Sequence, residues 1–276
     1  MDDLVSTAWL EQQLGSPDLA ILDASLFMPG EARDPAAEFA EVHIPGAQRF
    51  DIDALSDPDH PAPHMLPGAG VFGQAMAALG IGRDDRIVVY DNSPLRSATR
   101  GWFMLRHYGA DRVAILDGGL TKWRLEDRPV ESGAAAPRRA RFDAVEHGSI
   151  VAKAMLVHGV VSPILDARGR GRFDGSVPDP RPGVAPGHIP GSRNLPFGNL
   201  YRADGTLKSD EALAAEFASV GVDPHSAFVA TCGSGVTATS LLFAARRLGG
   251  RDARLYDGSW SEYGADPATP KVSGSV

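Results

Sequence analysis

The feature that most constrains the fold of this chain is an internal repeat. Five short segments recur in the same order, and the offset between the two copies stays within 140 to 145 positions. A nearly constant offset over five segments indicates two copies of one fold. The paired segments are 21–25 with 164–168, 43–47 with 188–192, 79–81 with 220–222, 86–91 with 227–232 and 117–119 with 257–259. In this alignment Asp91 of the first copy stands where Cys232 stands in the second.

Strands and helices alternate within each copy, as the second copy illustrates. Ser209 can cap a helix that ends near Gly221, because its hydroxyl accepts a backbone N–H and glycine commonly follows a helix. Short apolar runs predict strands, and apolar residues at helical spacing predict a further helix. These elements are the strands 164–167, 228–231 and 253–256 and the helix 237–248. The alternation predicts an α/β fold in each copy, with a mainly parallel sheet flanked by helices.

The repeat also sets the expected domain boundaries. Residues 1–128 form a first domain without a cysteine, and residues 149–276 form a second domain that carries it. Residues 129–148 hold small residues, prolines and charges with weak periodicity, which is typical of an interdomain linker. The tail after Pro267 is expected to fray.

Composition narrows the class of protein. The net charge of −8 argues against nucleic acid as the main partner, because phosphate recognition needs a basic surface. No run approaches the roughly 18 apolar residues of a membrane helix, and the acidic N-terminus has no apolar segment of signal-peptide type. One cysteine cannot form an internal disulfide, which agrees with a reducing compartment. We therefore expect a soluble cytoplasmic protein that does not bind membranes.

Cys232 lies between a predicted strand and the helix that follows it. The connecting residues 232–237 read CGSGVT, and the glycines at 233 and 235 let the backbone curl so that several N–H groups point inward. The next helix adds the positive end of its dipole. Such a cradle binds an anion and lowers the pKa of a thiol, and the thiolate is the nucleophilic form of cysteine. The sequence therefore predicts a reactive Cys232 rather than an inert buried one.

The residues 232–238 resemble the active-site loop of the 3-mercaptopyruvate sulfurtransferases, a branch of the rhodanese superfamily. The resemblance spans nearly the whole chain, including the cysteine-less first copy, and it implies tandem rhodanese-like domains. It also implies that a small anionic donor gives its outer sulfur to the Cys232 thiolate. The persulfide then passes this sulfur to a thiol, to cyanide or to a reduced protein such as thioredoxin, and no cofactor is needed beyond that covalent intermediate.

The loop bears on which donor the resemblance implies. Rhodaneses that prefer thiosulfate are similar but place cations inside the loop, where this chain has Gly233 and Ser234. A dianionic donor gains more from fixed cations than a monocarboxylate does, so the neutral loop favours 3-mercaptopyruvate. A thiosulfate sulfurtransferase is the nearest alternative. A non-catalytic persulfide carrier, loaded by another enzyme, is a third.

The resemblance also implies residues that hold the substrate. Arg172 and Arg181 match two arginines that bind the carboxylate and the ketone of the donor, and a guanidinium fork suits a planar carboxylate. Asp53 and His64 match residues of the catalytic cleft, where they orient Ser234 or assist proton transfer. The sulfur anion is held by Ser234 and by the loop N–H groups, which come from Gly233, Gly235, Val236 and Thr237.

Other polar residues are assigned to structure. His43 and His188 occur in both copies, so a role in folding explains them better than a role in catalysis. Arg168 and Arg170 are expected to be surface charges or partners in structural salt bridges. The segment 68–73 fits a dinucleotide-binding pattern, but no strand precedes it. Prolines at 58, 61 and 63 forbid a helix that would align the nearby histidines, so no metal site is expected.

Overall fold

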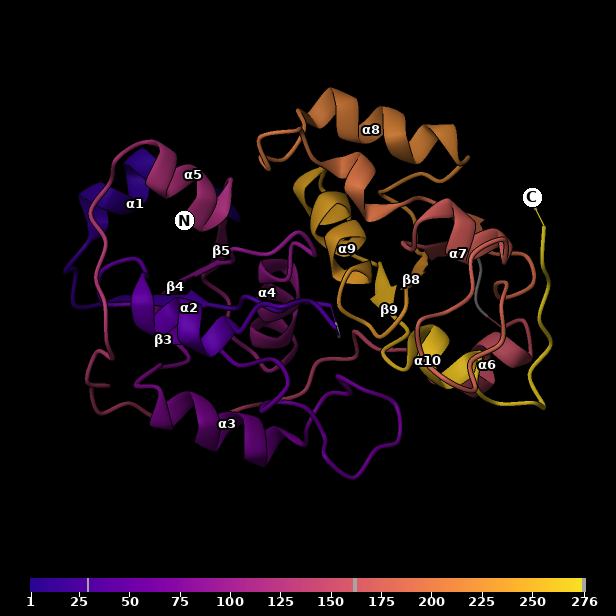
Figure 1. Cartoon of the computed structure of the whole chain (residues 1–276), viewed down its shortest axis with the longest axis horizontal. Helices are drawn as coiled ribbons and strands as arrows, with labels where there is room; N and C mark the ends of the chain where they lie inside the picture. The colour runs from indigo at the N-terminus through magenta and orange to yellow at the C-terminus, as the bar shows by residue number, and fades with distance from the viewer. Residues whose placement is uncertain (29, 161–162, 275–276) are drawn as a thin grey trace. The chain divides into compact units, whose positions relative to one another are not determined.

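The computed structural model describes residues 1–28, 30–160 and 163–274, and it divides into two compact units (Figure 1). The first unit comprises Met1–Ser56, Leu66–Gly148 and Ala203–Leu207. The second comprises Asp57–Met65, Ser149–Arg202 and Lys208–Val276. Each unit is an α/β domain built around a parallel sheet, so the predicted fold class is confirmed.

The sheet of the first unit has the strand order β1-β5-β4-β2-β3, and all its strand pairs are parallel. Alternate residues of β4 face opposite sides. Val88 and Tyr90 share a core with residues of α1, α2 and α5, whereas Val89 packs beside Gly101 of α4. Helices therefore cover both faces of this sheet, as parallel sheets require. The elements are β1 Leu4–Val5, α1 Thr7–Gln13, β2 Leu19–Asp23, α2 Pro35–Glu41, β3 Gln48–Arg49, α3 Ala69–Ala78, β4 Arg86–Tyr90, α4 Ala98–His107, β5 Val113–Leu116 and α5 Gly119–Leu125.

The sheet of the second unit has the strand order β7-β6-β8-β9, again with parallel pairs throughout. Its core places Ile164 and Val229 of the two central strands against Trp260 and Tyr263. These aromatic side chains belong to α10, which follows the edge strand β9. The elements are α6 Lys153–Val157, β6 Ile164–Asp166, α7 Arg170–Asp174, β7 Arg193–Asn194, the 3₁₀ helix η1 Phe197–Leu200, α8 Asp210–Ser219, β8 Val229–Thr231, α9 Ala238–Arg247, β9 Arg254–Leu255 and α10 Ser259–Tyr263.

The helix signals read from the second copy are present in the structure. Ser209 caps α8 by accepting the backbone N–H of Ala212, and Gly221 follows the helix with a positive φ of 65°. The predicted helix 237–248 corresponds to α9, which is one residue shorter at each end. The three predicted strands correspond to β6, β8 and β9, each shorter by one or two residues. Such differences at element ends are small.

The two units differ from the predicted domain boundaries at three places. Residues 57–65 group with the second unit, and residues 203–207 group with the first. The predicted linker, 129–148, also groups with the first unit. The reason is that it packs there. Phe142 is buried with its ring 5.6 Å from that of Phe72, and the backbone of Glu131 pairs with that of His43.

The C-terminal tail is held in place rather than frayed, so that prediction is wrong for residues 268–274. Val272 forms an antiparallel bridge with His188, and the N–H of Gly274 donates to the carbonyl of Asp174. These backbone hydrogen bonds replace contacts with water that a frayed tail would keep. Residues 275–276 lie outside the described part of the chain.

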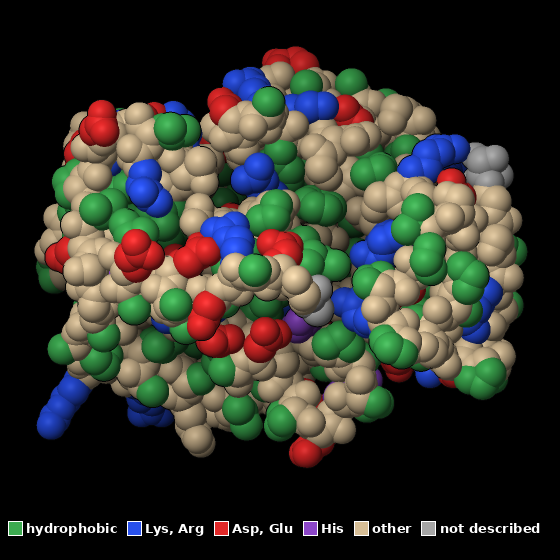
Figure 2. All heavy atoms as spheres, in the orientation of Figure 1, with side chains coloured by type: hydrophobic (Ala, Val, Ile, Leu, Met, Phe, Trp, Pro, Cys, Tyr) green, Lys and Arg blue, Asp and Glu red, His purple; other side chains and the backbone are tan. Residues whose placement is uncertain are grey.

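The described residues hold no membrane-spanning helix, and the face drawn in Figure 2 carries side chains of both charge signs. No helix among the described residues combines the length and the apolar character needed to cross a bilayer. On the one face that Figure 2 shows, the described Lys and Arg side chains are scattered among Asp and Glu side chains. This distribution agrees with the net charge of −8.

Candidate active site

The predicted nucleophile, Cys232, lies in the connection between the strand β8 and the helix α9. Cys232 is a free thiol with only 1% of its surface exposed. The loop 232–237, termed here the Cys232 loop, turns sharply at Gly235, whose φ of 75° disfavours any residue with a Cβ. Active sites of parallel α/β sheets form at this carboxyl end of the strands. The loop therefore has the position and the backbone geometry that the sequence predicted.

His64 and Ser234 are brought together across a long stretch of sequence. The Nδ1 atom of His64 lies 2.8 Å from Oγ of Ser234, which is a hydrogen-bond distance. His64 belongs to the second unit through the segment 57–65, whose ends are joined by a hydrogen bond from Asp57 N to Met65 O. Its φ of 62° is unusual for a residue other than glycine, and such backbone conformations concentrate at functional sites.

Asp53 belongs to the first unit and is exposed. Its backbone N–H donates to the carboxylate of Asp51. Its expected role beside Ser234 therefore stays a prediction.

Arg172 and Arg181 reach the same point of the Cys232 loop. A Cβ atom built on Gly233 would lie 3.1 Å from Nη2 of Arg172 and 3.3 Å from Nη1 of Arg181. Both guanidinium groups therefore stand over the residue that directly follows Cys232. The backbone at Gly233 does not require glycine, since its φ is not positive, but a Cβ there would push the two guanidinium groups back by a few tenths of an ångström.

The two arginines share one carboxylate, that of Asp179. Nη2 of Arg172 donates to Asp179 over 2.6 Å, and Nη1 of Arg181 lies 3.5 Å from its other oxygen. Burial raises the pKa of Asp179, but the hydrogen bond and the charge of Arg172 outweigh it and bring the pKa below its usual value. Asp179 is therefore an anion at neutral pH, and the three side chains together carry one net positive charge.

Two guanidinium donors remain available for a ligand. Within the described chain, Nε of Arg172 and Nη1 of Arg181 are buried and make no hydrogen bond, and Nη1 of Arg181 has only its 3.5 Å ion pair with Asp179. A buried charged donor without a partner is costly, and such groups commonly mark a position that an anion fills. The pair is thus suited to hold a carboxylate or an α-keto oxygen beside Gly233, the residue that follows Cys232.

Arg168 is a structural residue, as the sequence suggested, whereas Arg170 is exposed. Arg168 is 3% exposed and forms a salt bridge with the fully buried Asp166 on β6, with a nitrogen–oxygen distance of 2.7 Å. It also donates to the carbonyl of Arg172 and lies 4.6 Å from the ring centre of Trp260. Arg168 thereby ties α7, which carries Arg172, to the core.

The two histidines that match in the internal repeat, His43 and His188, occupy equivalent buried positions. His43 stacks on Phe39, with its Nδ1 atom 2.7 Å from the carbonyl of that residue. His188 stacks on Phe173 in the same way, with the corresponding distance 2.8 Å. Each histidine joins a turn to the preceding helix, and this geometry agrees with the structural role assigned from the repeat.

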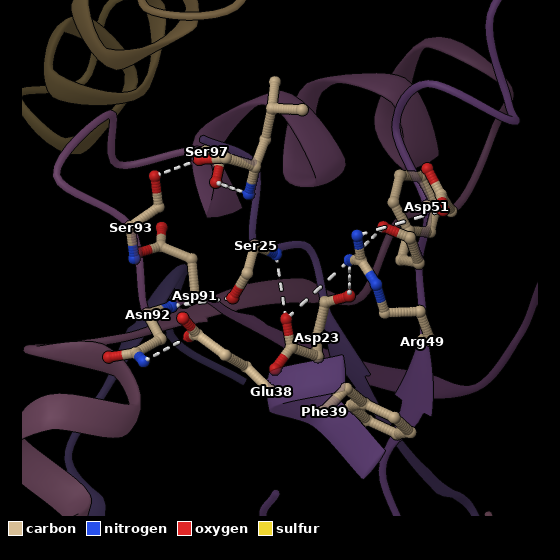
Figure 3. A network of polar contacts seen from close by, with 12 residues as sticks. Asp23, Ser25, Glu38, Phe39, Arg49, Asp51, Asp91, Asn92, Ser93 and Ser97 are labelled. Carbon is tan, nitrogen blue, oxygen red and sulfur yellow. Dashed lines mark hydrogen bonds and ion pairs between the residues drawn. The ribbon is translucent and has the colours of Figure 1, made fainter. Parts of the chain in front are cut away.

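In the first copy a carboxylate, that of Asp91, stands at the position of Cys232 and accepts backbone N–H groups (Figure 3). Asp91 accepts the backbone N–H of Ser93 over 3.1 Å and that of Ala98 over 2.7 Å. The N–H of Asn92 donates to Oγ of Ser25. These N–H groups are thus occupied by the side chains of Asp91 and Ser25, which leaves a sulfur anion little to bind there.

Asp91 should leave a signature in the pH dependence of stability. Burial raises its pKa to about 6, despite the hydrogen bonds from Ala98 and Ser93. Between about pH 4 and pH 6 the folded state therefore binds more protons than the unfolded state, so the free energy of unfolding falls as pH rises. The shift corresponds to about 3 kcal/mol of destabilisation at neutral pH.

Urea unfolding of the wild type and of Asp91→Asn from pH 4 to pH 7.5 checks this expectation. The difference in unfolding free energy between them should change by about 2 kcal/mol across that window, with the variant gaining relative to the wild type as pH rises. Asp111→Asn, at an exposed acid, controls for the loss of one charge. Parallel curves for Asp91→Asn and the wild type would show that Asp91 titrates normally.

The dinucleotide-like segment 68–73 is not preceded by a strand. Gly68 is the N-cap of α3, and residues 60–68 are turn or coil. In the described part of the chain, no group of three or more His, Cys, Asp or Glu side chains is arranged to hold a metal ion.

Sequence reasoning missed two residues that shape the site. Asp179 was overlooked among the surrounding charges, although its position between Arg172 and Arg181 in the sequence suggested an ion pair. Ser259 was noticed only as part of the repeat. Its Oγ atom accepts the backbone N–H groups of Cys232 and Gly235, at 3.1 Å and 3.0 Å.

Comparison with known proteins gives consistent matches over nearly the whole chain. Residues 6–126 and 151–266 each match the rhodanese-like domain family. The 3-mercaptopyruvate sulfurtransferase of Escherichia coli K12 is 42% identical over 271 residues, which cover 96% of each chain. The human 3-mercaptopyruvate sulfurtransferase is 42% identical over 270 residues, covering 94% of this chain and 91% of that one. The crystal structure of SseA from Escherichia coli superimposes with a TM-score of 0.85 at 40% identity, covering 95% of this chain and all of that one.

Proposed function

This chain belongs to the rhodanese family, and we propose that it is a 3-mercaptopyruvate sulfurtransferase that carries sulfur on Cys232 as a persulfide. The observation that supports this function best is the pair of arginines over the Cys232 loop. Nη2 of Arg172 and Nη1 of Arg181 lie beside Gly233, the residue that follows the nucleophile. Nε of Arg172 and Nη1 of Arg181 are buried donors that, within the described chain, make no hydrogen bond. A carboxylate with an adjacent ketone, as in 3-mercaptopyruvate, presents the two kinds of oxygen that such a pair binds.

The first half-reaction transfers sulfur to the enzyme. The thiolate of Cys232 attacks the sulfur atom of 3-mercaptopyruvate, so that an S–S bond forms and the C–S bond breaks. The electron pair of the broken bond passes to carbon as the enolate of pyruvate. The enolate takes up the proton of the former donor thiol and leaves as pyruvate, and Cys232 is left as a persulfide anion.

Ser234 and His64 are placed to move that proton. Ser234 directly follows Gly233 in the loop, and its hydroxyl lies within hydrogen-bond distance of the His64 imidazole. A hydroxyl held by an imidazole can receive a proton from the sulfur and pass one to the enolate carbon. Ser234 can also donate to the sulfur anion, together with the loop N–H groups of Gly233, Val236 and Thr237. The N–H of Gly235, predicted from the sequence to do the same, donates to Oγ of Ser259 instead.

The second half-reaction returns Cys232 to the thiolate. A thiolate acceptor attacks the outer sulfur, takes it as its own persulfide, and leaves the electron pair of the S–S bond on Cys232. Small thiols, cyanide and a reduced protein such as thioredoxin are acceptors of this chemical kind. The cycle needs no cofactor, and a reducing cytoplasmic location suits a lone cysteine that must remain a thiol between turnovers.

A donor comparison tests the proposal. Turnover with cyanide as acceptor is measured with 3-mercaptopyruvate and with thiosulfate, and the ratio of kcat/KM values is expected to favour 3-mercaptopyruvate. Mass spectrometry after mixing with donor alone should show one added sulfur atom on Cys232. A preference for thiosulfate would make the chain a thiosulfate sulfurtransferase. If neither donor adds sulfur to Cys232, the third alternative is favoured, which is a non-catalytic persulfide carrier loaded by another enzyme.

Asp179 is expected to control the rate of the first half-reaction. In Asp179→Asn the arginines lose the carboxylate that fixes their orientation, and a small misplacement of a substrate-holding group is costly. The extra positive charge compensates in part for weaker binding, so kcat should fall about tenfold while KM changes less. Asp174→Asn is the control, because that carboxylate accepts the N–H of Ser176 and binds neither arginine. Equal kinetics for both variants would contradict this role.

A further inference from the structure

We propose that Ser259 is a positioning residue for the nucleophile. Its hydroxyl binds two N–H groups of the Cys232 loop and so fixes the loop backbone, and the other N–H groups of the loop remain free to bind sulfur. The inference rests on the proposed function and extends it to a residue outside the loop. Ser259 is the first residue of α10 and is completely buried. Its hydroxyl contacts the loop at the backbone N–H groups of Cys232 and Gly235.

The hydroxyl of Ser259 uses all of its hydrogen-bonding capacity in this position. It accepts the N–H of Cys232 over 3.1 Å and the N–H of Gly235 over 3.0 Å. It donates its own proton to the carbonyl of Tyr256 over 2.9 Å. Because the hydroxyl proton is donated to Tyr256, both lone pairs of the oxygen are available to the loop, and the two N–H groups that they accept are no longer available to a sulfur anion.

The remaining N–H groups of the loop have no such partner. Within the described residues, no hydrogen bond is made by the backbone N–H of Gly233, Ser234, Val236 or Thr237. These are the groups that can converge on a sulfur anion attached to Cys232. Ser259 thus removes the first and the fourth N–H of the loop from that set and fixes the backbone that presents the others.

The next two residues of α10 donate backbone hydrogen bonds to carbonyl groups of the Cys232 loop. The N–H of Trp260 donates to the carbonyl of Cys232 over 3.0 Å, and the N–H of Ser261 donates to that of Gly233 over 2.8 Å. The indole of Trp260 is in turn held by the carbonyl of Ala185. Carbonyl dipoles would repel a sulfur anion, so their attachment to α10 keeps them pointing away from the thiol.

The backbone conformation of Ser259 favours glycine, so the presence of a serine there suggests that its side chain has a role. Its φ of 48° lies in the left-handed region, where residues other than glycine are strained. The repeat places Gly119 at the same position of the first copy, with a φ of 58°. A Cβ atom on Gly119 would lie 2.3 Å from the carbonyl oxygen of Asp91. The copy without a cysteine therefore uses glycine here, and the copy with the cysteine accepts strain to place a hydroxyl.

The first copy also shows what the loop does without this hydroxyl. The N–H of Leu120 donates to the carbonyl of Asp91, as Trp260 does to Cys232, so the backbone clamp is common to both copies. In contrast, Thr121 at the position of Ser261 donates its hydroxyl to the side chain of Asn92. The contact of the Ser259 hydroxyl with two loop N–H groups has no counterpart in the first copy, where residue 119 is glycine.

Two variants at Ser259 separate positioning from folding. Ser259→Gly removes the hydroxyl and relieves the left-handed strain, whereas Ser259→Ala removes the hydroxyl and keeps the strain. Ser259→Gly should therefore melt at or above the temperature of Ser259→Ala. Both should lose about tenfold in kcat for 3-mercaptopyruvate with little change in KM, because Arg172 and Arg181 still hold the donor. Ser192→Ala is the control, since it removes a buried hydroxyl that donates to the carbonyl of Ile189 and touches no loop residue.

The rate at which iodoacetamide alkylates Cys232 at a fixed pH gives a readout that does not depend on sulfur transfer. It should fall in both Ser259 variants and stay unchanged in Ser192→Ala. Wild-type kcat and alkylation in Ser259→Gly would overturn the proposal, as would a loss seen only in KM. If the wild type transfers sulfur from neither donor, the proposed function fails, and the alkylation rates still decide whether Ser259 positions the nucleophile.

Discussion

Replacing Cys232 with serine should abolish sulfur transfer from 3-mercaptopyruvate, with a fall of at least about 1000-fold in kcat. A serine hydroxyl is neutral at pH 7 and is a far weaker nucleophile toward sulfur than a thiolate. It also cannot carry the outer sulfur as a persulfide, so both half-reactions lose their common intermediate. Pyruvate release in the presence of a thiol acceptor, followed at saturating donor, measures the effect.

The loss should be specific to the second copy of the repeat. Serine is nearly the size of cysteine, and Cys232 is buried at the end of β8, so the variant should keep the circular dichroism spectrum of the wild type. Asp91→Asn changes the matching position of the first copy and should keep full turnover at 25 °C. Turnover by Cys232→Ser well above background would mean that sulfur moves directly from donor to acceptor, without a persulfide.

The parts of the fold predicted from sequence are those with local or repeated signals. The helix α8 was placed by Ser209 and Gly221, because capping and left-handed termination depend on a few adjacent residues. No such local signal predicts that residues 57–65 group with the second unit and residues 203–207 with the first. This grouping depends on contacts between segments far apart in the chain, as does the packing of Phe142 against Phe72.

The site shows the same division. Cys232 and its glycines were predictable, because a strand, a tight loop and a helix follow one another directly in the sequence. His64 was placed by family resemblance, and its hydrogen bond to Ser234 spans 170 positions. The replacement of Gly119 by Ser259 was visible in the repeat. Its meaning was not, because the hydroxyl acts through the backbone of a loop 24 to 27 positions away.

The second large effect is expected at the arginines. Arg172→Ala and Arg181→Ala should each lower kcat/KM for 3-mercaptopyruvate about 100-fold, because each removes a buried charged partner of the donor. Either change also leaves Asp179 facing only one arginine, which cancels the net positive charge of the site. Arg170→Ala is the control, since Arg170 is exposed in the same short helix as Arg172.

Thiosulfate separates donor recognition from general damage to the loop. It has neither a carboxylate nor a ketone, so its kcat/KM should fall less than that of 3-mercaptopyruvate in both variants. Equal losses for the two donors would show that the arginines support the Cys232 loop rather than recognise the donor. Arg181→Lys refines the comparison, because lysine keeps the charge and loses the planar fork.

The split between KM and kcat should also assign the two arginines to the two oxygens. Negative charge develops on the ketone oxygen as the C–S bond breaks and the enolate forms, whereas the charge of the carboxylate does not change. The arginine that binds the ketone therefore acts mainly in the transition state, and its removal lowers kcat. The arginine that binds the carboxylate acts equally in both states, and its removal raises KM. Since both guanidinium groups lie close to Gly233, only this kinetic difference distinguishes their roles.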